Sequence, residues 1–200
     1  MDDVFKTIAG TSEGVYKEKG SKFLAFAYSV NTEEDVRKLL TEIREKYYDA
    51  RHHCYAYMLG SDKKTFRFND DGEPSSTAGK PILGQIYSKD ITNVLIIVVR
   101  YFGGTKLGVS GLIHAYREAA ADALANADIV EKTLNTVFRI SFNYALLNDV
   151  MRIIKEEAPD VLDRNFENEC RMTLSIRKSN ADKLYDRLTK VEGLKIDIEN

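Results

Sequence analysis

The sequence lacks any long run of apolar residues. Its longest uninterrupted apolar stretch, residues 94–99, is far shorter than the ~20 residues that a membrane-spanning helix needs. The chain also opens with MDDVFK, which places acidic residues where a secretory signal peptide has a basic start and an apolar segment. We therefore expect a protein that is not secreted and has no membrane partner.

Cysteine is scarce as well. Cys54 and Cys170 are the only two cysteines, and their wide separation matches no spacing of metal ligands. This pattern favours a reduced, cytoplasmic location and two unreactive thiols. It predicts neither a metal site nor a cofactor.

The chain has no excess of charge of one sign. The 29 basic and 31 acidic residues give a formal net charge of −2, which argues against non-specific capture of nucleic acid by net charge. A local basic loop can still bind phosphate, because salt confines such fields to about 10 Å. With 44% hydrophobic residues, the 200-residue chain can bury a core, and its length suits two domains of about 100 residues.

The first part of the chain mixes strand and helix patterns. We expect strands at 22–30, 52–59, 65–69 and 91–102, and helices at 33–47 and 112–127. Residues 14–21 before the first strand read as a loop, and residues 70–84 show no periodicity. The segment 91–102 is apolar on both sides near its middle, so it should lie centrally in a sheet.

The rest of the chain has a different order of strand and helix patterns. We expect strands at 133–142, 161–168, 171–177 and 194–198, and helices at 145–157 and 180–191. This β-α-β-β-α-β order is that of a ferredoxin-like domain. We therefore predict an α+β protein with two domains, residues 1–132 and residues 133–200.

The segment DDGEPSSTAGKP at residues 70–81 is the first candidate for a binding site. Its carboxylates could bind a divalent cation or orient a polar partner, and the alternative is a solvated turn that caps its own backbone. The candidate ligand-binding residues are Asp70, Asp71, Glu73, Thr77 and Lys80.

The glycine-rich segment RYFGGTKLGVSG at residues 100–111 is the second candidate. A turn from a strand into a helix exposes backbone N–H groups at the positive end of the helix dipole, which binds anions. The glycines match neither a Walker loop nor the Rossmann pattern, and close packing of strand and helix is the alternative. The candidate residues are Arg100, Gly103, Gly104, Lys106 and Gly108.

The segment RHHCYAY at residues 51–57 is the third candidate. On a strand, His53, Tyr55 and Tyr57 share one face, and we expect that face to be open, with rings able to stack on bases. The opposite face, which carries Cys54, should pack on helices. Neighbouring histidines on opposite faces cannot chelate one metal together, and His114 should be a helix-surface residue.

These three segments resemble the IMPACT family, including its bacterial YigZ-like members. The family pattern is close to A-x-H-H-C-x-A-Y, then D-D-G-E-P-x-x-T-A-G-x-P-I-L, then V-V-R-Y-F-G-G-x-K-L-G-x-x-G-L-x-x-A-Y. These motifs stand here at residues 50–57, 70–83 and 98–116.

The resemblance implies an N-terminal fold like the second domain of a small-subunit ribosomal protein, also seen in domain four of elongation factor G. It implies helices on one side of a sheet and a ferredoxin-like second domain. It further implies that eukaryotic relatives regulate translation by binding a partner of the kinase that senses amino-acid starvation, and that bacterial members bind nucleic acid or nucleotides.

No Ser-His-Asp, Cys-His or paired-carboxylate set can be assembled from these segments. We therefore predict a non-enzymatic binding protein in translation or stress control, which contacts RNA, a ribosomal surface or a regulatory protein. The alternative is an enzyme acting on a phosphorylated or nucleotide-like substrate in a cleft between residues 70 and 111. We expect the loops at residues 70–80 and 103–111 to border that cleft. A deep pocket with Asp71, Arg100 and Lys106 would favour the enzyme, and an open aromatic face would favour the binding protein.

Overall fold

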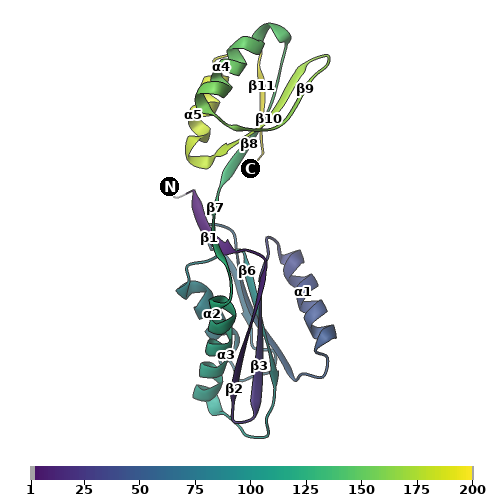
Figure 1. Ribbon diagram of the computed structural model, residues 1–200, viewed down its shortest axis with the longest axis vertical. Helices are drawn as coiled ribbons and strands as arrows, with labels where there is room; N and C mark the ends of the chain where they lie inside the picture. Colours follow the sequence, from purple (N-terminus) through teal and green to yellow (C-terminus); the bar gives the residue numbers. More distant parts are fainter. Residues whose placement is uncertain (1–2, 200) are drawn as a thin grey trace. The chain divides into compact units, whose positions relative to one another are not determined.

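The structure is a computed structural model that describes residues 3–199. The chain divides into two compact units, one formed by Phe5–Lys132 and the other by the residues from Thr133 onward together with those before Phe5. Helices and strands are mixed, and the strands form several sheets (Figure 1). The predicted α+β class is confirmed, whereas the finer fold assignments remain predictions.

A five-stranded sheet lies at the centre of the first unit, in the order β2-β3-β6-β4-β5. All neighbouring strands are antiparallel. The central position of β6 agrees with its apolar sequence, because every residue but the last is buried. The bounds are β2 (Thr11–Glu18), β3 (Ser21–Ser29), β6 (Val94–Tyr101), β4 (His52–Leu59) and β5 (Thr65–Asn69).

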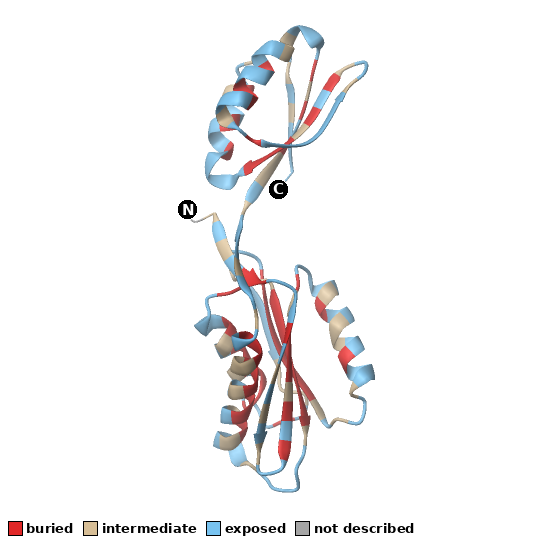
Figure 2. Cartoon of the chain, in the orientation of Figure 1, coloured by how far each residue is buried: buried red, intermediate tan, exposed pale blue. Residues whose placement is uncertain are grey.

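Helices cover both faces of this sheet (Figure 1). Helix α1 (Glu33–Lys46) packs Val36 and Ile43 against one face of β4 and β6. Helices α2 (Gly79–Ser88) and α3 (Gly108–Ala125) pack on the other face. Figure 2 shows buried residues on the helix sides that face the strands and exposed residues on the outer sides. The implied arrangement with helices on one side is therefore wrong, because β4 and β6 are apolar on both faces and both need cover.

The predicted loop at residues 14–21 is also wrong, because β2 runs through most of it. This strand is at the sheet edge, and its exposed residues, which include Glu13 and Lys17, alternate with less exposed ones. Gly14 lets β2 lie directly on α3, since a Cβ there would be 2.2 Å from the backbone nitrogen of Ala123. The turn to β3 uses Gly20, whose φ is +79°.

Helix α2 lies partly within the stretch that lacks periodicity, and the sequence pattern does not predict it. A further two-stranded sheet pairs β1 (Val4–Ile8) with β7 (Ile129–Thr133). The pattern predicts neither strand.

The second unit holds a four-stranded sheet in the order β11-β8-β10-β9. Its two helices pack on one face, where Phe138, Leu174 and Leu184 are buried together. The element order agrees with the predicted β-α-β-β-α-β, while the ferredoxin-like assignment stays a prediction. The elements are β8 (Asn135–Phe142), a 3₁₀ turn (Tyr144–Leu146), α4 (Leu147–Glu157), β9 (Asp160–Phe166), β10 (Cys170–Arg177), α5 (Lys178–Leu188) and β11 (Lys195–Glu199).

Asp3 also belongs to this second unit. Its carboxylate accepts a hydrogen bond of 2.6 Å from the hydroxyl of Ser179, in the first turn of α5. Its backbone carbonyl accepts one of 2.7 Å from the N–H of Leu134. Among the residues that the structure describes, no helix is both long and apolar enough to cross a membrane.

Candidate functional site

A pocket of about 520 Å³ opens in the first unit between the two loops that the sequence singles out. Glu73 comes from the first loop, and Lys106 and Gly108 from the second. The expectation that both loops border one cleft is therefore confirmed. The lining residues are Arg51, His52, Gly72, Glu73, Pro74, Arg100, Phe102, Lys106, Leu107, Gly108, Val109 and Leu112.

Asp70 holds the first loop together rather than lining the pocket. Its carboxylate accepts hydrogen bonds from three backbone N–H groups, of Ser76 at 2.8 Å, Ala78 at 3.0 Å and Gly79 at 2.8 Å. The last two belong to the start of α2, so Asp70 caps that helix from eight residues upstream of Ala78. Its carboxylate oxygens are thus occupied by the backbone.

Asp71 joins the loop to β4. Its carboxylate accepts a 2.7 Å hydrogen bond from the backbone N–H of His53 and lies 3.2 Å from the exposed Arg44 guanidinium. Its carbonyl accepts a 2.8 Å bond from Nδ1 of His52. Because a carbonyl only accepts, Nδ1 carries a proton, and Nε2 of His52 lies 3.9 Å from Oε1 of Glu73.

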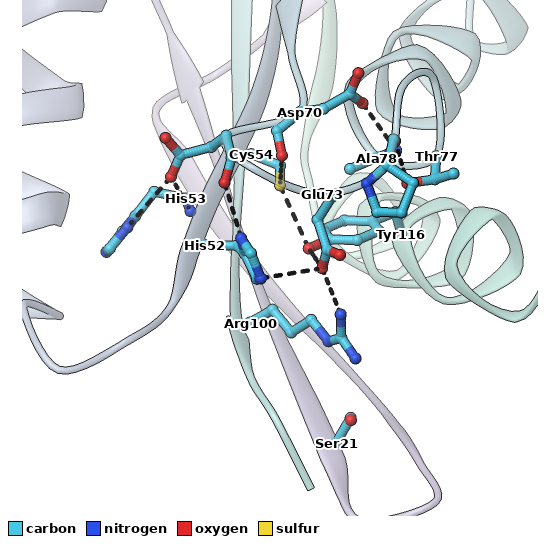
Figure 3. A network of polar contacts seen from close by, with 12 residues as sticks. Ser21, His52, His53, Cys54, Asp70, Glu73, Thr77, Ala78, Arg100 and Tyr116 are labelled. Carbon is cyan, nitrogen blue, oxygen red and sulfur yellow. Dashed lines mark hydrogen bonds and ion pairs between the residues drawn. The ribbon is translucent and has the colours of Figure 1, made fainter. Parts of the chain in front are cut away.

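Glu73 is the centre of a buried polar network (Figure 3). Its Oε1 accepts a 2.6 Å hydrogen bond from Nη1 of Arg100 and a 2.7 Å bond from the hydroxyl of Tyr116. The Cys54 thiol lies 3.3 Å from that hydroxyl and 3.0 Å from the carbonyl of Asp70, and its single hydrogen can go to either. A buried carboxylate is stable here because it is paired with a cation and hydrogen-bonded.

Burial also sets the protonation of the two neutral members of this network. It raises the pKa of the Tyr116 hydroxyl far above its ordinary value, with the nearby Cys54 and Glu73 adding to the effect. Burial likewise raises the pKa of the Cys54 thiol. Both groups therefore stay protonated at neutral pH, and Cys54 lacks the thiolate that reactive cysteines need.

Arg100 is almost wholly buried, with 6% of its surface exposed, yet it lines the pocket. Its guanidinium carbon lies 5.5 Å from the ring centre of Phe23 and 5.6 Å from that of Phe102. Nη1 is bonded to Glu73, whereas the buried Nε has no hydrogen-bond partner. Buried donors are usually paired, so this group has unused binding capacity.

The remaining predicted site residues are divided between structural and peripheral positions. Thr77 is buried, and its hydroxyl donates to the carbonyl of Pro74. Lys80 is exposed on α2 and does not line the pocket. Gly103 packs on the turn before β3, where a Cβ would be 1.9 Å from the carbonyl carbon of Gly20. Gly104 has a φ of +89° in open space.

The predicted open aromatic face of β4 is wrong. His53 and Tyr55 are 7% and 8% exposed, and Tyr57 is also buried. All three lie on the face that α1 covers, and the His53 ring bonds to the carbonyl of Tyr47. Their rings cannot reach a base while α1 is in place. The other expectations hold: Cys54 packs under α2 and α3, and His114 is exposed on α3.

Sequence reasoning missed Arg51, His52 and Phe102 as pocket residues. Alternation along β4 could have found His52, because it places that ring on the face of Cys54, opposite His53. Phe102 comes two residues after Arg100, yet no pattern shows that 46% of its surface remains exposed beside the buried guanidinium. Of the trio Asp71, Arg100 and Lys106, the structure brings only Arg100 and Lys106 to the pocket.

The arrangement suits anion binding. Arg51, Arg100 and Lys106 converge from three segments, and the only ion pair among them within residues 3–199 joins Arg100 to Glu73. Gly108, the first residue of α3, adds the positive end of a helix dipole. In the same range, no group of three or more His, Cys, Asp or Glu residues is placed to hold a metal ion.

Comparisons with known proteins agree with this organisation. The family model described as the Impact N-terminal domain matches residues 19–124. The IMPACT family member YvyE of Bacillus subtilis is 28% identical over 191 residues, which cover 96% of this chain and 87% of that protein. The IMPACT family member YigZ of Escherichia coli is 30% identical over 151 residues, or 74% of each chain.

A solved structure shares the fold along nearly the whole chain. The crystal structure of a hypothetical protein superposes with a TM-score of 0.73 at 25% sequence identity, covering 98% of this chain and 97% of that one. The matched domain, the bacterial relatives and the shared fold lead to one conclusion: this chain belongs to the IMPACT family, with YigZ among its similar bacterial members.

Proposed function

We propose that this protein is a non-enzymatic binding protein in the control of translation or stress responses, and that it binds an anionic partner, RNA or a ribosomal surface, at the pocket of its first unit. Membership of the IMPACT family supports the role in translation, because the family resemblance implies that eukaryotic relatives regulate translation. A cytoplasmic location is part of this proposal.

The observation that carries the proposal is the convergence of Arg51, Arg100 and Lys106 on one pocket. Two of these cations have no ion pair within residues 3–199, and the third shares its partner Glu73 with Tyr116. Arginine and lysine at such a site are the residues that contact phosphate oxygens in nucleic-acid complexes.

The alternative, an enzyme for a phosphorylated or nucleotide-like substrate, is less well supported by this geometry. A general acid or base must lie within hydrogen-bond reach of its substrate. Asp70 and Asp71 do not line the pocket, and both carboxylates bond to the backbone. Glu73 lines it, but its Oε1 accepts from Arg100 and Tyr116. These carboxylates are therefore better suited to building the pocket than to proton transfer.

Titration of labelled single-stranded RNA at several salt concentrations tests the proposal. We expect affinity to fall with salt, and Lys106→Ala to reduce the log–log slope by about 0.7 by removing one phosphate contact. Lys89→Ala, an exposed lysine outside the pocket, is the matched control and should leave the slope unchanged. RNA binding with no change in Lys106→Ala would place the contact elsewhere.

Absence of RNA binding even at low salt would overturn the nucleic-acid part of the proposal. Affinity capture from lysate, with and without nuclease, then separates the remaining choices. A partner that survives nuclease treatment and is lost in Lys106→Ala is a regulatory protein bound at the same pocket.

A further inference from the structure

We infer that the pocket of the first unit binds a small phosphate monoester that carries an aromatic ring, with the phosphate held by Arg51, Arg100 and Lys106 and the ring placed on Phe102. The inference deepens the proposed function, and it rests on that function only because both use the same pocket. The pocket has a basic wall from these three cations, and an apolar wall, which is formed by Pro74, Phe102, Leu107, Val109 and Leu112.

The charge of the pocket matches a phosphate monoester. Three cations and one carboxylate, Glu73, leave two positive charges at its wall. A monoester carries close to two negative charges at neutral pH, whereas a phosphodiester linkage carries one. The balance therefore favours a terminal phosphate over an internal one.

Arg100 supplies the strongest single observation. Its side chain is buried, it lines the pocket, and its Nε has no partner even though Nη1 is bonded to Glu73. A buried donor without a partner costs free energy, so the guanidinium has more hydrogen-bonding capacity than Glu73 uses. Because Glu73 and the rings of Phe23 and Phe102 fix the guanidinium, little side-chain entropy is lost on binding.

The start of α3 adds a second set of donors. This 18-residue helix begins at Gly108 in the pocket wall, its N-terminus has no side-chain cap, and its first turn contains no acidic residue. Its first backbone N–H groups therefore have no side-chain acceptor of their own. A phosphate is well placed at such a helix end, where the dipole favours negative charge.

The apolar wall points to a ring rather than to a bare anion. Phe102 is 46% exposed and Val109 is 59% exposed, so both can still bury surface against a ligand. Aromatic side chains bind flat rings by stacking, in a sequence-tolerant way. The volume of about 520 Å³ falls within the range of 300–1,000 Å³ that is typical of small-molecule sites.

Calorimetric titration of the full chain with three probes tests the inference: AMP, which has a phosphate and an aromatic ring, ribose 5-phosphate, which has the phosphate but no aromatic ring, and adenosine, which has the aromatic ring but no phosphate. We expect AMP to bind most tightly, ribose 5-phosphate more weakly, and adenosine not measurably. Lys106→Ala should weaken the affinity for AMP and for ribose 5-phosphate about tenfold or more, as expected for the loss of a hydrogen bond to a charged group. Phe102→Ala should weaken the binding of AMP more than that of ribose 5-phosphate, because only AMP loses a stacking contact.

Lys89→Ala is the control and should bind all probes like the original chain, and circular dichroism confirms that each variant is folded. The inference is overturned if neither phosphate binds, if adenosine binds as well as AMP, or if Lys106→Ala leaves both affinities unchanged. RNA with a 5′-hydroxyl end distinguishes it from the proposed function. If this RNA binds and AMP does not, only the inference is refuted. If AMP binds and RNA does not, only the RNA contact of the proposed function is refuted.

Discussion

Glu73 shows how a single charged residue is accommodated inside the first unit. Its carboxylate is 4% exposed and receives hydrogen bonds from Arg100 and Tyr116, which together replace the water it loses. Removing one partner of such a group leaves the charge poorly compensated, which is more damaging than losing a hydrogen bond at the surface.

Tyr116→Phe tests this point at the residue scale. The variant keeps the buried ring but loses the hydroxyl that donates to Glu73 and lies 3.3 Å from the Cys54 thiol. We expect a loss of about 1–3 kcal/mol in the free energy of unfolding, because the buried carboxylate of Glu73 loses one of its two hydrogen bonds. Urea denaturation followed by circular dichroism gives the value.

The matched control is Tyr101→Phe, whose hydroxyl donates to the exposed partner Asp49. At that exposed position water replaces the lost donor, so the free energy of unfolding should change by less than about 1 kcal/mol. Equal losses in the two variants would contradict the special role of the Glu73 network.

Part of this site could be predicted from the sequence, because residue types and their alternation along a strand indicate which side chains can bind a ligand. Arg100, Lys106 and Gly108 stand out in a glycine loop after a strand, and the structure places all three at the pocket. Tyr55 failed the same reasoning, because alternation shows which residues share a face but not which helix covers that face. That depends on α1, whose docking is a tertiary property.

At the scale of the elements, α2 shows why local signals can miss a helix. Its N-cap residue, Ala78, has no side-chain cap, and Pro81 lies in its first turn. The acceptor for its first N–H groups is Asp70, across the loop. Rules for helix starts examine the flanking residues, so a cap that folds back from so far upstream escapes them.

Asp70→Ala tests this remote cap. Loss of the carboxylate releases the N–H groups of Ser76, Ala78 and Gly79 together, so we expect a destabilisation of about 2 kcal/mol, at the upper end for a helix cap. Hydrogen exchange should become faster in the first turn of α2. Asp62→Ala removes a single acceptor for the N–H of Lys64 in an exposed turn and is the control, for which we expect little change.

Helix α1 offers a contrasting, local cap whose effect depends on pH. The carboxylate of Asp35 accepts hydrogen bonds from the N–H groups of Asn31 and Thr32, while Thr32 caps the N–H of Asp35 in return. These bonds hold the pKa of Asp35 below its ordinary value of 3.8. The stabilisation is therefore complete above pH 3.8 and is lost as the pH falls through the lower folded-state pKa.

Asp35→Asn should accordingly be less stable than the original chain at neutral pH, with the difference shrinking as acid protonates Asp35. Thermal melting between neutral pH and about pH 2 measures this dependence. Glu45→Gln, an exposed residue on the same helix, serves as the control. If the difference in melting temperature between the original chain and Asp35→Asn stays constant across this pH range, the cap is not electrostatic.

At the scale of the whole molecule, two separate cores predict two separate unfolding events. Ile96 is buried among the strands and helices of the first unit, and Leu174 is buried in the second. No residue belongs to both clusters, and each cluster has its own sheet and its own helices. Domains with independent cores can unfold separately when the interface between them is small.

Differential scanning calorimetry of two core variants tests this independence. Ile96→Ala and Leu174→Ala should each cost about 2–5 kcal/mol, because both create a cavity in a fully buried site. We expect two transitions in the original chain, with Ile96→Ala lowering the midpoint of one and Leu174→Ala that of the other. A single transition that both variants shift alike would instead show that the two units unfold together, and limited proteolysis would then yield no stable fragment from cleavage near residues 131–135.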